Sequence, residues 1–403
     1  MIHVKGEVKM AGTEIFGTEE IRAVTDVIER RMVHRYGSHH LRNGIYRVEE
    51  FENKAKKITG SGYALGVANG TAALIVALKG IGIQPGDEII TTPFSFIATV
   101  EAIVACNAVP VLGEIDGTLG LDADSVERLI SGRTRAIMPV HMFGAAADMD
   151  RFTDLGKKYN LPVIEDACEV VGGTYKGRYL GSLGTCGTWS FDPNKTLTVG
   201  EGGIVLTDSE DVYFKMDCYH DHGHIHSKEH DRGAEGKSGL GVNYRLSEVQ
   251  GALGIVALEK MLSALGMLRA AKKKILEAAL DAGLKPRPVH DEEGDTASHV
   301  VFILPTAEKA KRFKAAANHA GGSFGIIADN TWHYAKHWKA LEEMGEKDYF
   351  GNRTPSYSPA SMAKSDAMLS CAVMAGLNTC MDDSAVEKMI EAVRAGAQAA
   401  LQR

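Results

Sequence analysis

From about residue 63 onward, the chain alternates short apolar runs with segments of helical periodicity, and this alternation constrains its fold more than any other feature. The apolar runs lie at 63–67, 88–92, 109–115, 136–140, 163–165, 187–191 and 203–206. The helix-like segments lie between several of them, at 71–80, 97–106, 125–130 and 149–159. Strands that alternate with helices predict an α/β domain with a mostly parallel sheet. Such sheets bind their ligands beyond the carboxyl ends of the strands.

The segments outside this region have other patterns. Residues 1–60 indicate a lead-in with two amphipathic helices, and residues 208–244 are polar and rich in His and Gly, which is typical of a long functional loop. Residues 247–282 have the alanine- and leucine-rich pattern of a long helix. Two further apolar runs of strand length and a final helical segment follow, at 300–304, 323–327 and 384–402. We therefore predict a lead-in with a large α/β domain over residues 1–260 and a smaller α+β domain over residues 261–403.

Charge and composition exclude several classes of protein. The chain has 45 Lys and Arg against 52 Asp and Glu, a net charge of −7, which argues against nucleic acid or an anionic membrane as the main partner. It has no run of eighteen apolar residues, and residues 1–10 lack a signal-peptide core. The 6 cysteines show no Cys-x-x-Cys spacing. We expect reduced thiols and a cytoplasmic protein.

Lys195 is the strongest candidate for a catalytic residue. It lies in the segment 190–203, which begins Ser-Phe-Asp-Pro-Asn-Lys and continues into a Gly-Glu-Gly-Gly turn before an apolar run. A lysine between a buried strand and such a turn is a candidate covalent nucleophile. A Schiff-base lysine needs a lowered pKa, and we expect an enclosed, partly apolar site to supply it.

Three further features follow predicted strands. Asp166 ends an apolar run, and a carboxylate there could pair with a protonated ring nitrogen or could simply cap the next turn. Gly70 and Thr71 stand where a strand passes directly into a helix, which makes an anion seat or a plain helix cap. Phe96 could stack on a flat cofactor or belong to the core. Together with Lys195, these features predict a site for pyridoxal 5′-phosphate.

The lysine segment and the Glu165-Asp166-Ala167 segment resemble the motifs of the DegT/StrS-type sugar aminotransferases, which are fold-type I pyridoxal-phosphate enzymes. The segment 241–250, Gly-Val-Asn-Tyr-Arg-Leu-Ser-Glu-Val-Gln, is similar to a third motif of that family. The resemblance implies a mostly parallel seven-stranded sheet with helices on both faces. It implies an aminotransferase that moves an amino group from an amino acid, with glutamate as the expected donor, to a keto sugar.

The resemblance also assigns roles to single residues. Lys195 would be the Schiff-base lysine, and Asp166 would be the partner of the pyridine nitrogen. The cofactor phosphate would be held by Gly70, Thr71 and Ser190, and the ring would be covered by Phe96. Asn243 would reach the phosphate of the neighbouring subunit, which implies a homodimer with shared active sites.

A narrower resemblance concerns the substrate. The segments at 221–224, 231–235, 332–334 and 364–368 look like those of the family branch that makes 8-amino-3,8-dideoxy-octulosonate, an acidic eight-carbon sugar. An acidic substrate needs cationic partners. The candidates are Arg35, His39, His40, Arg42, His222, Arg232 and His333. Each of these could equally be a solvated surface side chain.

Glu169 departs from the family pattern, which usually has Gln or His at this position near the phenolic oxygen of the cofactor. A carboxylate facing a phenolate is repulsive unless one of them is protonated. Glu169 could therefore be neutral, could turn away, or could change the electronics of the cofactor. This leaves open a second function on the same fold, namely elimination, cyclisation or oxidation of an amino-acid substrate.

The histidines at 220, 222, 224 and 226 alternate along the chain. On one face of a strand they could bind a metal. The run has no cysteine partners and lies in a segment of Gly, Asp and Lys, so we expect no metal site.

Overall fold

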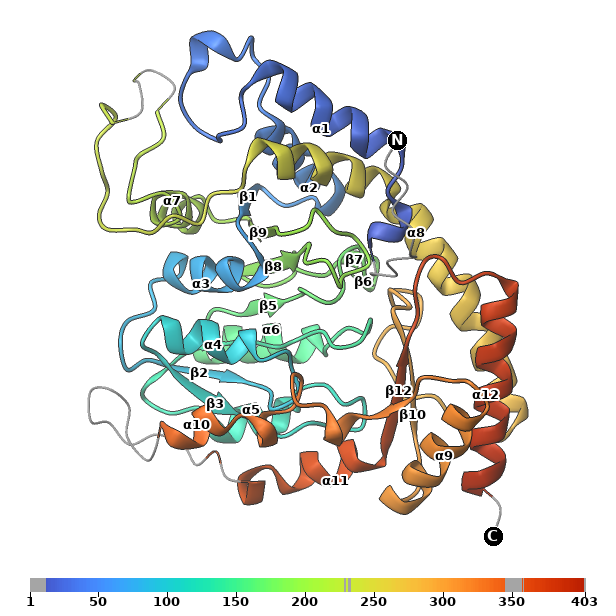
Figure 1. The fold of residues 1–403 in the computed structure, drawn as a ribbon. Helices are drawn as coiled ribbons and strands as arrows, with labels where there is room; N and C mark the ends of the chain where they lie inside the picture. Colours follow the sequence, from blue (N-terminus) through green and yellow to red (C-terminus); the bar gives the residue numbers. More distant parts are fainter. Residues whose placement is uncertain (1–11, 228–229, 231–232, 345–356, 358, 402–403) are drawn as a thin grey trace.

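The computed structural model describes residues 12–227, 230, 233–344, 357 and 359–401. Its centre is one sheet made of two sections, with strand orders β1-β9-β8-β5 and β4-β2-β3. Parallel bridges from Ile137 to Val163 and from Val140 to Asp166 join β4 to β5. The strands are β1 (Tyr63–Val67), β2 (Glu88–Thr91), β3 (Val109–Leu112), β4 (Thr134–Ile137), β5 (Ile164–Asp166), β8 (Cys186–Ser190) and β9 (Gly203–Thr207). Within this sheet β9 runs antiparallel to both of its neighbours, β1 and β8, and the other paired strands are parallel. The mostly parallel seven-stranded sheet is confirmed, and Figure 1 shows β1, β9, β8, β5, β2 and β3 stacked in this order.

Helices cover both faces of the sheet, because successive strand residues point to opposite sides. Ile89 packs with helices α3 (Gly70–Gly80), α4 (Ala98–Ala105) and α7 (Glu210–Tyr219). Its neighbour Ile90 packs in a separate core with residues from the helices of the other face. These are α2 (Arg47–Thr59), α5 (Ala123–Leu129), α6 (Met149–Tyr159) and the first half of α8 (Glu248–Asp281), while α1 (Thr18–Arg30) lies on the outer side of α8.

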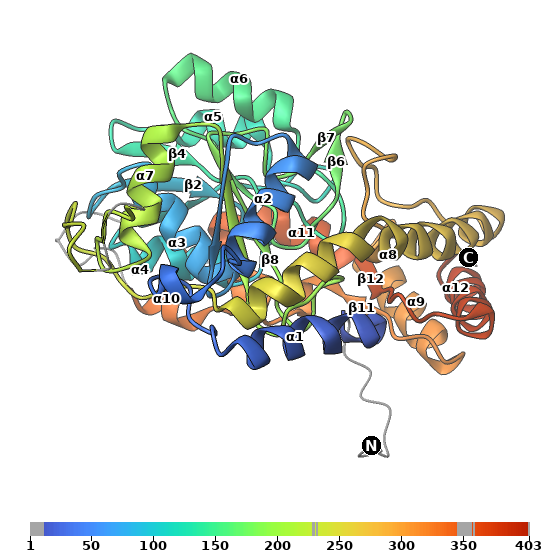
Figure 2. The same ribbon diagram turned by 90° about the horizontal axis from the view of Figure 1, so that it is seen from above.

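The C-terminal part is an α+β layer beside the edge-on sheet (Figures 1 and 2). Its antiparallel sheet has the order β10-β12-β11, with β10 at His299–Ile303, β11 at Gly325–Ile326 and β12 at Ala372–Gly376. Its helices are α9 (Ala307–His319), α10 (Lys339–Glu343), α11 (Ala363–Cys371) and α12 (Asp383–Leu401). Phe302, Phe313 and Phe324 lie at the centre of its core. Smaller elements complete the described residues: β6 (Thr174–Tyr175), β7 (Arg178–Tyr179) and 3-10 turns at Thr13–Ile15, His39–Leu41, Ile327–Asp329, Ala335–His337 and Pro359–Met362.

Three details differ from the sequence prediction. Residues 208–244 are not loop throughout, because Ser209 caps α7 by accepting from the Val212 N–H, and Val212 and Met216 bury one face of the helix. The strand predicted at 323–327 is only two residues long, since the chain turns into a 3-10 helix at Ile327. The central strand β12 was not predicted. The domain boundary at 260 stays a prediction, and α8 runs through it without a break.

Helix α8 has 34 residues. Within the described part of the chain it is the one helix long and apolar enough to cross a membrane, and most of its apolar stretch is buried inside the protein. It packs against α1, α2 and α12. This is the environment of a core helix.

Candidate active site

A cavity of about 670 Å³ lies at the carboxyl ends of the sheet strands. Residues that follow β1, β2, β4, β5 and β8 line one side of it, and residues of the C-terminal part line the rest. Among the predicted site residues, those that line the cavity are Gly70, Thr71, Phe96, Asp166, Glu169, Ser190, Lys195 and His333. Segments far apart in the sequence therefore meet where the parallel sheet predicts a ligand site.

The start of α3 forms one wall of the cavity. The Asn69 side chain caps the helix by accepting from the Ala72 N–H at 2.8 Å. A Cβ at position 70 would lie 2.8 Å from both Cβ and Oγ of Ser190, so only glycine lets the helix approach this strand end. The first backbone N–H groups of a helix point along its axis and favour an anion. Gly70, Thr71 and Ser190 are thus brought together as predicted.

Asp166 is the last residue of β5 and is 4% exposed. Its Oδ2 accepts from the Thr99 hydroxyl at 2.6 Å, and its Oδ1 accepts from the Cys168 N–H at 3.2 Å. Ser95 supports Thr99 through a hydroxyl contact of 2.5 Å. These contacts fix the carboxylate in the cavity wall. Sequence reasoning missed Thr99, since nothing near it in the chain marks it as a partner of a strand end 67 residues away.

Lys195 and Glu169 form an ion pair in the cavity, with Nζ 3.3 Å from Oε1. The same oxygen lies 3.1 Å from Nε2 of His333. Burial alone would raise the pKa of Glu169, but the charges of Lys195 and His333 outweigh it and hold that pKa well below its usual range. Glu169 is thus charged here and faces the cavity, so it is neither neutral nor turned away.

The expected lowering of the Lys195 pKa is wrong for this form of the protein. Burial does act to lower it, but the Glu169 carboxylate and the Cys168 thiol act in the opposite direction and leave the pKa above its ordinary value. The prediction considered only enclosure, and the partner that reverses the shift lies 26 residues away in the sequence.

Phe96 stands at the rim of the cavity and is 37% exposed. Its ring lies nearly parallel to that of Trp332, with 6.1 Å between the centroids, and Lys195 Nζ lies 5.9 Å from its centroid. Trp332 is itself 62% exposed. The two rings form an aromatic edge beside the lysine, and stacking of Phe96 on a cofactor stays a prediction.

Several predicted residues lie away from the cavity of this chain. Asn243 and His222 are exposed, and Asn243 pairs with Asp221 in a short bridge. Arg42 is 2% exposed, donates to the carbonyls of His34 and Gly37, and lies 3.6 Å from Glu248. Their roles toward a substrate or a second subunit remain predictions. The predicted Arg232 lies outside the described residues.

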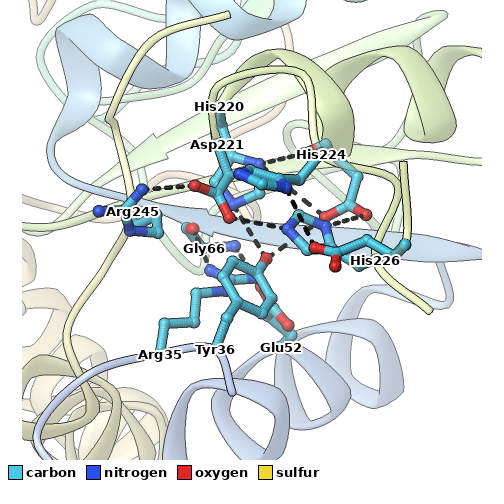
Figure 3. A network of polar contacts seen from close by, with 11 residues as sticks. Arg35, Tyr36, Glu52, Gly66, His220, Asp221, His224, His226 and Arg245 are labelled. Carbon is cyan, nitrogen blue, oxygen red and sulfur yellow. Dashed lines mark hydrogen bonds and ion pairs between the residues drawn. The ribbon is translucent and has the colours of Figure 1, made fainter. Parts of the chain in front are cut away.

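Arg35 belongs to a buried polar network that ties the lead-in to β1 and to the segment after α7 (Figure 3). Its Nη1 donates to the Gly66 carbonyl and its Nη2 to Glu52 Oε1, both at 2.5 Å. Glu52 also accepts from the Gly66 N–H at 2.6 Å. Only 6% of the Arg35 side chain and 9% of the Glu52 side chain are exposed. The position of Arg35 is that of a structural ion pair.

The alternating histidines have separate environments. His226 lies between two carboxylates, with Nδ1 2.7 Å from Asp217 and Nε2 2.9 Å from Asp221, and it stacks on Tyr36. Burial lowers the pKa of His220 to about 3, with a further contribution from the nearby Arg35 charge. Among the described residues, no group of His, Cys, Asp and Glu has an arrangement that could hold a metal ion.

His226 should make stability depend on pH. Burial opposes its charge, but Asp217 and Asp221 raise its pKa above the ordinary 6.5. Because the folded state holds the proton more tightly, the stabilisation is complete below about pH 6.5 and is lost as the pH rises through the folded pKa. We expect His226→Gln to lower the free energy of unfolding by about 1–2 kcal/mol at pH 6 and by less at pH 9. Denaturant unfolding at both pH values checks this, with the exposed His319→Gln as control.

Sequence reasoning singled out His333 and the segment 332–334 but missed the rest of the cavity wall contributed by the C-terminal part. Asn330 and Trp332 precede His333, and Thr296, Ser298 and His299 lead into β10. The segment around His333 reaches the site because Ser95 and Ile97 donate to the carbonyls of His333 and Trp332, at 3.0 Å each. No local signal in the sequence marks this pairing.

Comparisons with known proteins agree with this geometry. The DegT/DnrJ/EryC1/StrS aminotransferase family matches residues 17–394. A GDP-perosamine synthase of Caulobacter vibrioides is 41% identical over 215 residues, which are 53% of this chain and 57% of that protein. The chain thus spans little more than half the length of this curated relative.

Two solved structures extend the comparison over nearly the whole chain. An aminotransferase from Psychrobacter cryohalolentis is 26% identical with a TM-score of 0.80, covering 94% of this chain and 96% of that one. The ntda protein from Bacillus subtilis, which has bound cofactor PMP, is 20% identical with a TM-score of 0.78, covering 94% and 82%, and this shows a shared fold. The chain belongs to the DegT/DnrJ/EryC1/StrS aminotransferase family.

Proposed function

We propose that this protein uses pyridoxal 5′-phosphate to transfer an amino group from an amino acid, with glutamate as donor, to a keto sugar. The observation that carries the proposal is that Lys195 and Asp166 line one cavity together with the start of α3 and Ser190. A lysine amine, a buried carboxylate and an anion seat are the groups that this cofactor requires.

The residues present fit that cofactor. Gly70 leaves room at Ser190 that a side chain would fill, and Asp166 is held in place by Thr99. The Oε2 atom of Glu169 is buried and has no hydrogen-bond partner among the described residues. Buried polar atoms of this kind mark places where a ligand donor is expected. Glu169 is therefore suited to accept a hydrogen bond from a bound group, and a cofactor oxygen facing it would have to carry the proton.

Each of four residues in the cavity would have a separate role in the transfer of the amino group. The cofactor, when bound, supplies an electron-withdrawing ring that stabilises negative charge on the carbon that loses a proton. Lys195 would hold it through Nζ and, once displaced by the donor amine, would move the proton as base and then as acid. Asp166 would keep a proton on the ring nitrogen. Glu169 and His333 would position Nζ between these steps.

For the acceptor, we propose an acidic keto sugar. The four segments that resemble the octulosonate branch favour an acidic keto sugar, whereas the Caulobacter relative is named for a GDP-linked sugar. Both acceptors are anionic. Turnover with an acidic eight-carbon keto sugar and none with a GDP-linked keto sugar would support the first, and the reverse would support the second.

We also propose a homodimer in which Asn243 completes the neighbour's phosphate site. Asn243 is exposed and lies on the segment that follows the polar network, which suits a contact with a second subunit. None of the 6 cysteines, all of which lie among the described residues, is joined in a disulfide, in keeping with a cytoplasmic protein.

The decisive experiment is a half-reaction. Cofactor-loaded protein mixed with L-glutamate should convert fully to its amine-bearing form, which is followed by the absorption spectrum, with release of 2-oxoglutarate. No conversion with any common amino donor would support the second function, namely elimination, cyclisation or oxidation, which Glu169 leaves open.

Asp166→Asn should lower turnover on the order of a hundredfold or more, because an amide cannot hold a proton on the ring nitrogen. Steady-state kinetics with glutamate measure the loss. The exposed Asp281→Asn is the control and should change nothing. Equal turnover of both variants would remove Asp166 from the mechanism.

A further inference from the structure

The cavity wall from the C-terminal part carries two hydroxyl side chains, Thr296 and Ser298. They stand on either side of Ala297, whose φ of 63° lies in the left-handed region. The Ala297 N–H donates to Asp295 Oδ1 at 2.6 Å, and the Thr296 N–H donates to the Gly144 carbonyl at 3.0 Å. These two hydrogen bonds from the backbone fix the segment that carries the hydroxyls before any ligand binds.

The Thr296 hydroxyl is buried and makes no hydrogen bond with the described residues. The residue is 2% exposed, and its Oγ1 is buried without a hydrogen-bond partner among the described residues. Burying an unpartnered hydroxyl is unfavourable, and native proteins rarely keep one unless a ligand or water uses it. Since Thr296 also lines the cavity, its hydroxyl is available to a ligand there.

The Thr296 and Ser298 hydroxyls both lie close to the backbone of Gly144. A Cβ on Gly144 would lie 3.0 Å from Thr296 Oγ1, 3.2 Å from Ser298 Oγ and 2.8 Å from Asp295 Oδ1. The φ of Gly144 is +87°, a conformation that favours glycine. Glycine at position 144 therefore lets the segment 295–298 pack closely against this backbone, which fixes where Thr296 and Ser298 stand in the cavity wall.

The charges around this place are mostly positive. Asp295 is paired with Lys272 at 2.7 Å, and its carbonyl accepts from Arg269 Nε at 2.9 Å. Arg287, 7% exposed, donates to the carbonyls of Met142 and Phe143, which directly precede Gly144. None of the ion pairs found among the described residues includes Arg287. Arg287 thus has no described carboxylate at ion-pair distance, although the charges of Asp295 and Glu169 partly offset the effect of burial on its pKa, and an anionic ligand would give this buried cation a direct partner.

His299 lies beside Ser298. Burial is the main cause that lowers its pKa to about 4; the Glu169 charge opposes this shift, and the Arg287 and Lys272 charges act in the same direction as burial. The imidazole is therefore neutral near pH 7, and its Nδ1 lies 3.0 Å from Ser298 Oγ. A neutral ring there can accept from Ser298 or donate to it, so it orients the hydroxyl without adding a charge.

We propose that Thr296 and Ser298 form a carboxylate-binding subsite of the cavity, in which both hydroxyls donate to a substrate carboxylate and Arg287 supplies the positive charge behind it. This rests on the proposed function. The carboxylate can come from the amino donor or from an acidic keto sugar, which must occupy the same cavity in turn.

Calorimetric titration of cofactor-loaded protein with glutarate, a dicarboxylate that cannot react, tests the subsite. We expect Thr296→Val and Ser298→Ala each to raise the Kd for glutarate about tenfold or more, because each removes a hydrogen bond to a charged group. Thr59→Val, at the end of helix α2 and outside the cavity lining, is the matched control and should bind as the wild type does. The melting temperature of Thr296→Val should not fall, because its hydroxyl has no protein partner to lose.

An unchanged Kd in both variants, or no binding of glutarate to the wild type, would overturn the subsite. Single-turnover half-reactions then separate the sources of the carboxylate. Slower conversion by glutamate in the variants assigns it to the donor, and slowing only of the return reaction with an acidic eight-carbon keto sugar assigns it to the acceptor. A wild type that binds glutarate through Thr296 but does not react with glutamate would refute the proposed function while leaving the subsite standing.

Discussion

Lys195→Ala should lower transamination turnover by at least about a thousandfold, since it removes both the amine that holds the cofactor and the group that moves the proton. The absorption band of the cofactor-loaded wild type should be absent from the variant. Lys195→Arg keeps the charge that Glu169 pairs with but cannot replace the amine, so it should be equally inactive.

The control for this prediction is Lys176→Ala, which removes a lysine of similar charge whose side chain is 63% exposed and paired with Asp150. Its turnover should match the wild type. If Lys195→Ala retained the absorption band and full turnover, Lys195 would not be the cofactor lysine, and the proposed function would fail with it.

Arg35→Met should lower the free energy of unfolding by about 3–5 kcal/mol, the largest stability effect we expect from a single substitution outside the cavity. The change leaves the Glu52 carboxylate and the Gly66 carbonyl buried without their cationic partner. Burial already raises the pKa of Glu52 even with Arg35 beside it, which shows how poorly this position tolerates an unpaired charge. Equilibrium denaturation measures the loss.

Two comparisons make this result specific. Arg30→Met breaks the exposed pair with Asp26 and should cost no more than about 0.5 kcal/mol. The double variant Arg35→Met/Glu52→Gln should recover much of the loss, because a neutral amide oxygen can still accept from the Gly66 N–H. A loss for Arg35→Met as small as that for Arg30→Met would show that the buried pair contributes little.

The centre of the site could be predicted from sequence because it depends on local geometry. Gly70, Asp166 and Ser190 each stand at a strand end, and the carboxyl ends of parallel strands meet at one edge of the sheet. Once the alternation of strands and helices is recognised, their convergence follows. Lys195 follows β8 by only a few residues, so it is carried to the same edge.

The rest depends on partners that the sequence does not pair. The positive charges of Arg35 and Arg42 suggested substrate contacts. In the structure both side chains are buried, and they form ion pairs with Glu52 and Glu248. The raised pKa of Lys195 depends on Glu169 in the same way. Thr296 and Ser298 reach the cavity only because the C-terminal part packs beside the sheet. No sequence pattern near these two residues indicates that packing.

Helix α8 contributes side chains to two separate hydrophobic cores. Met261 and Leu265 pack in the core under the large sheet, and Leu268 and Ile275, along the same helix, pack in the core of the C-terminal part. Melting the helix would expose both cores to water together. The two walls of the cavity are therefore thermodynamically coupled, and folding the large sheet helps to assemble the wall that carries Thr296.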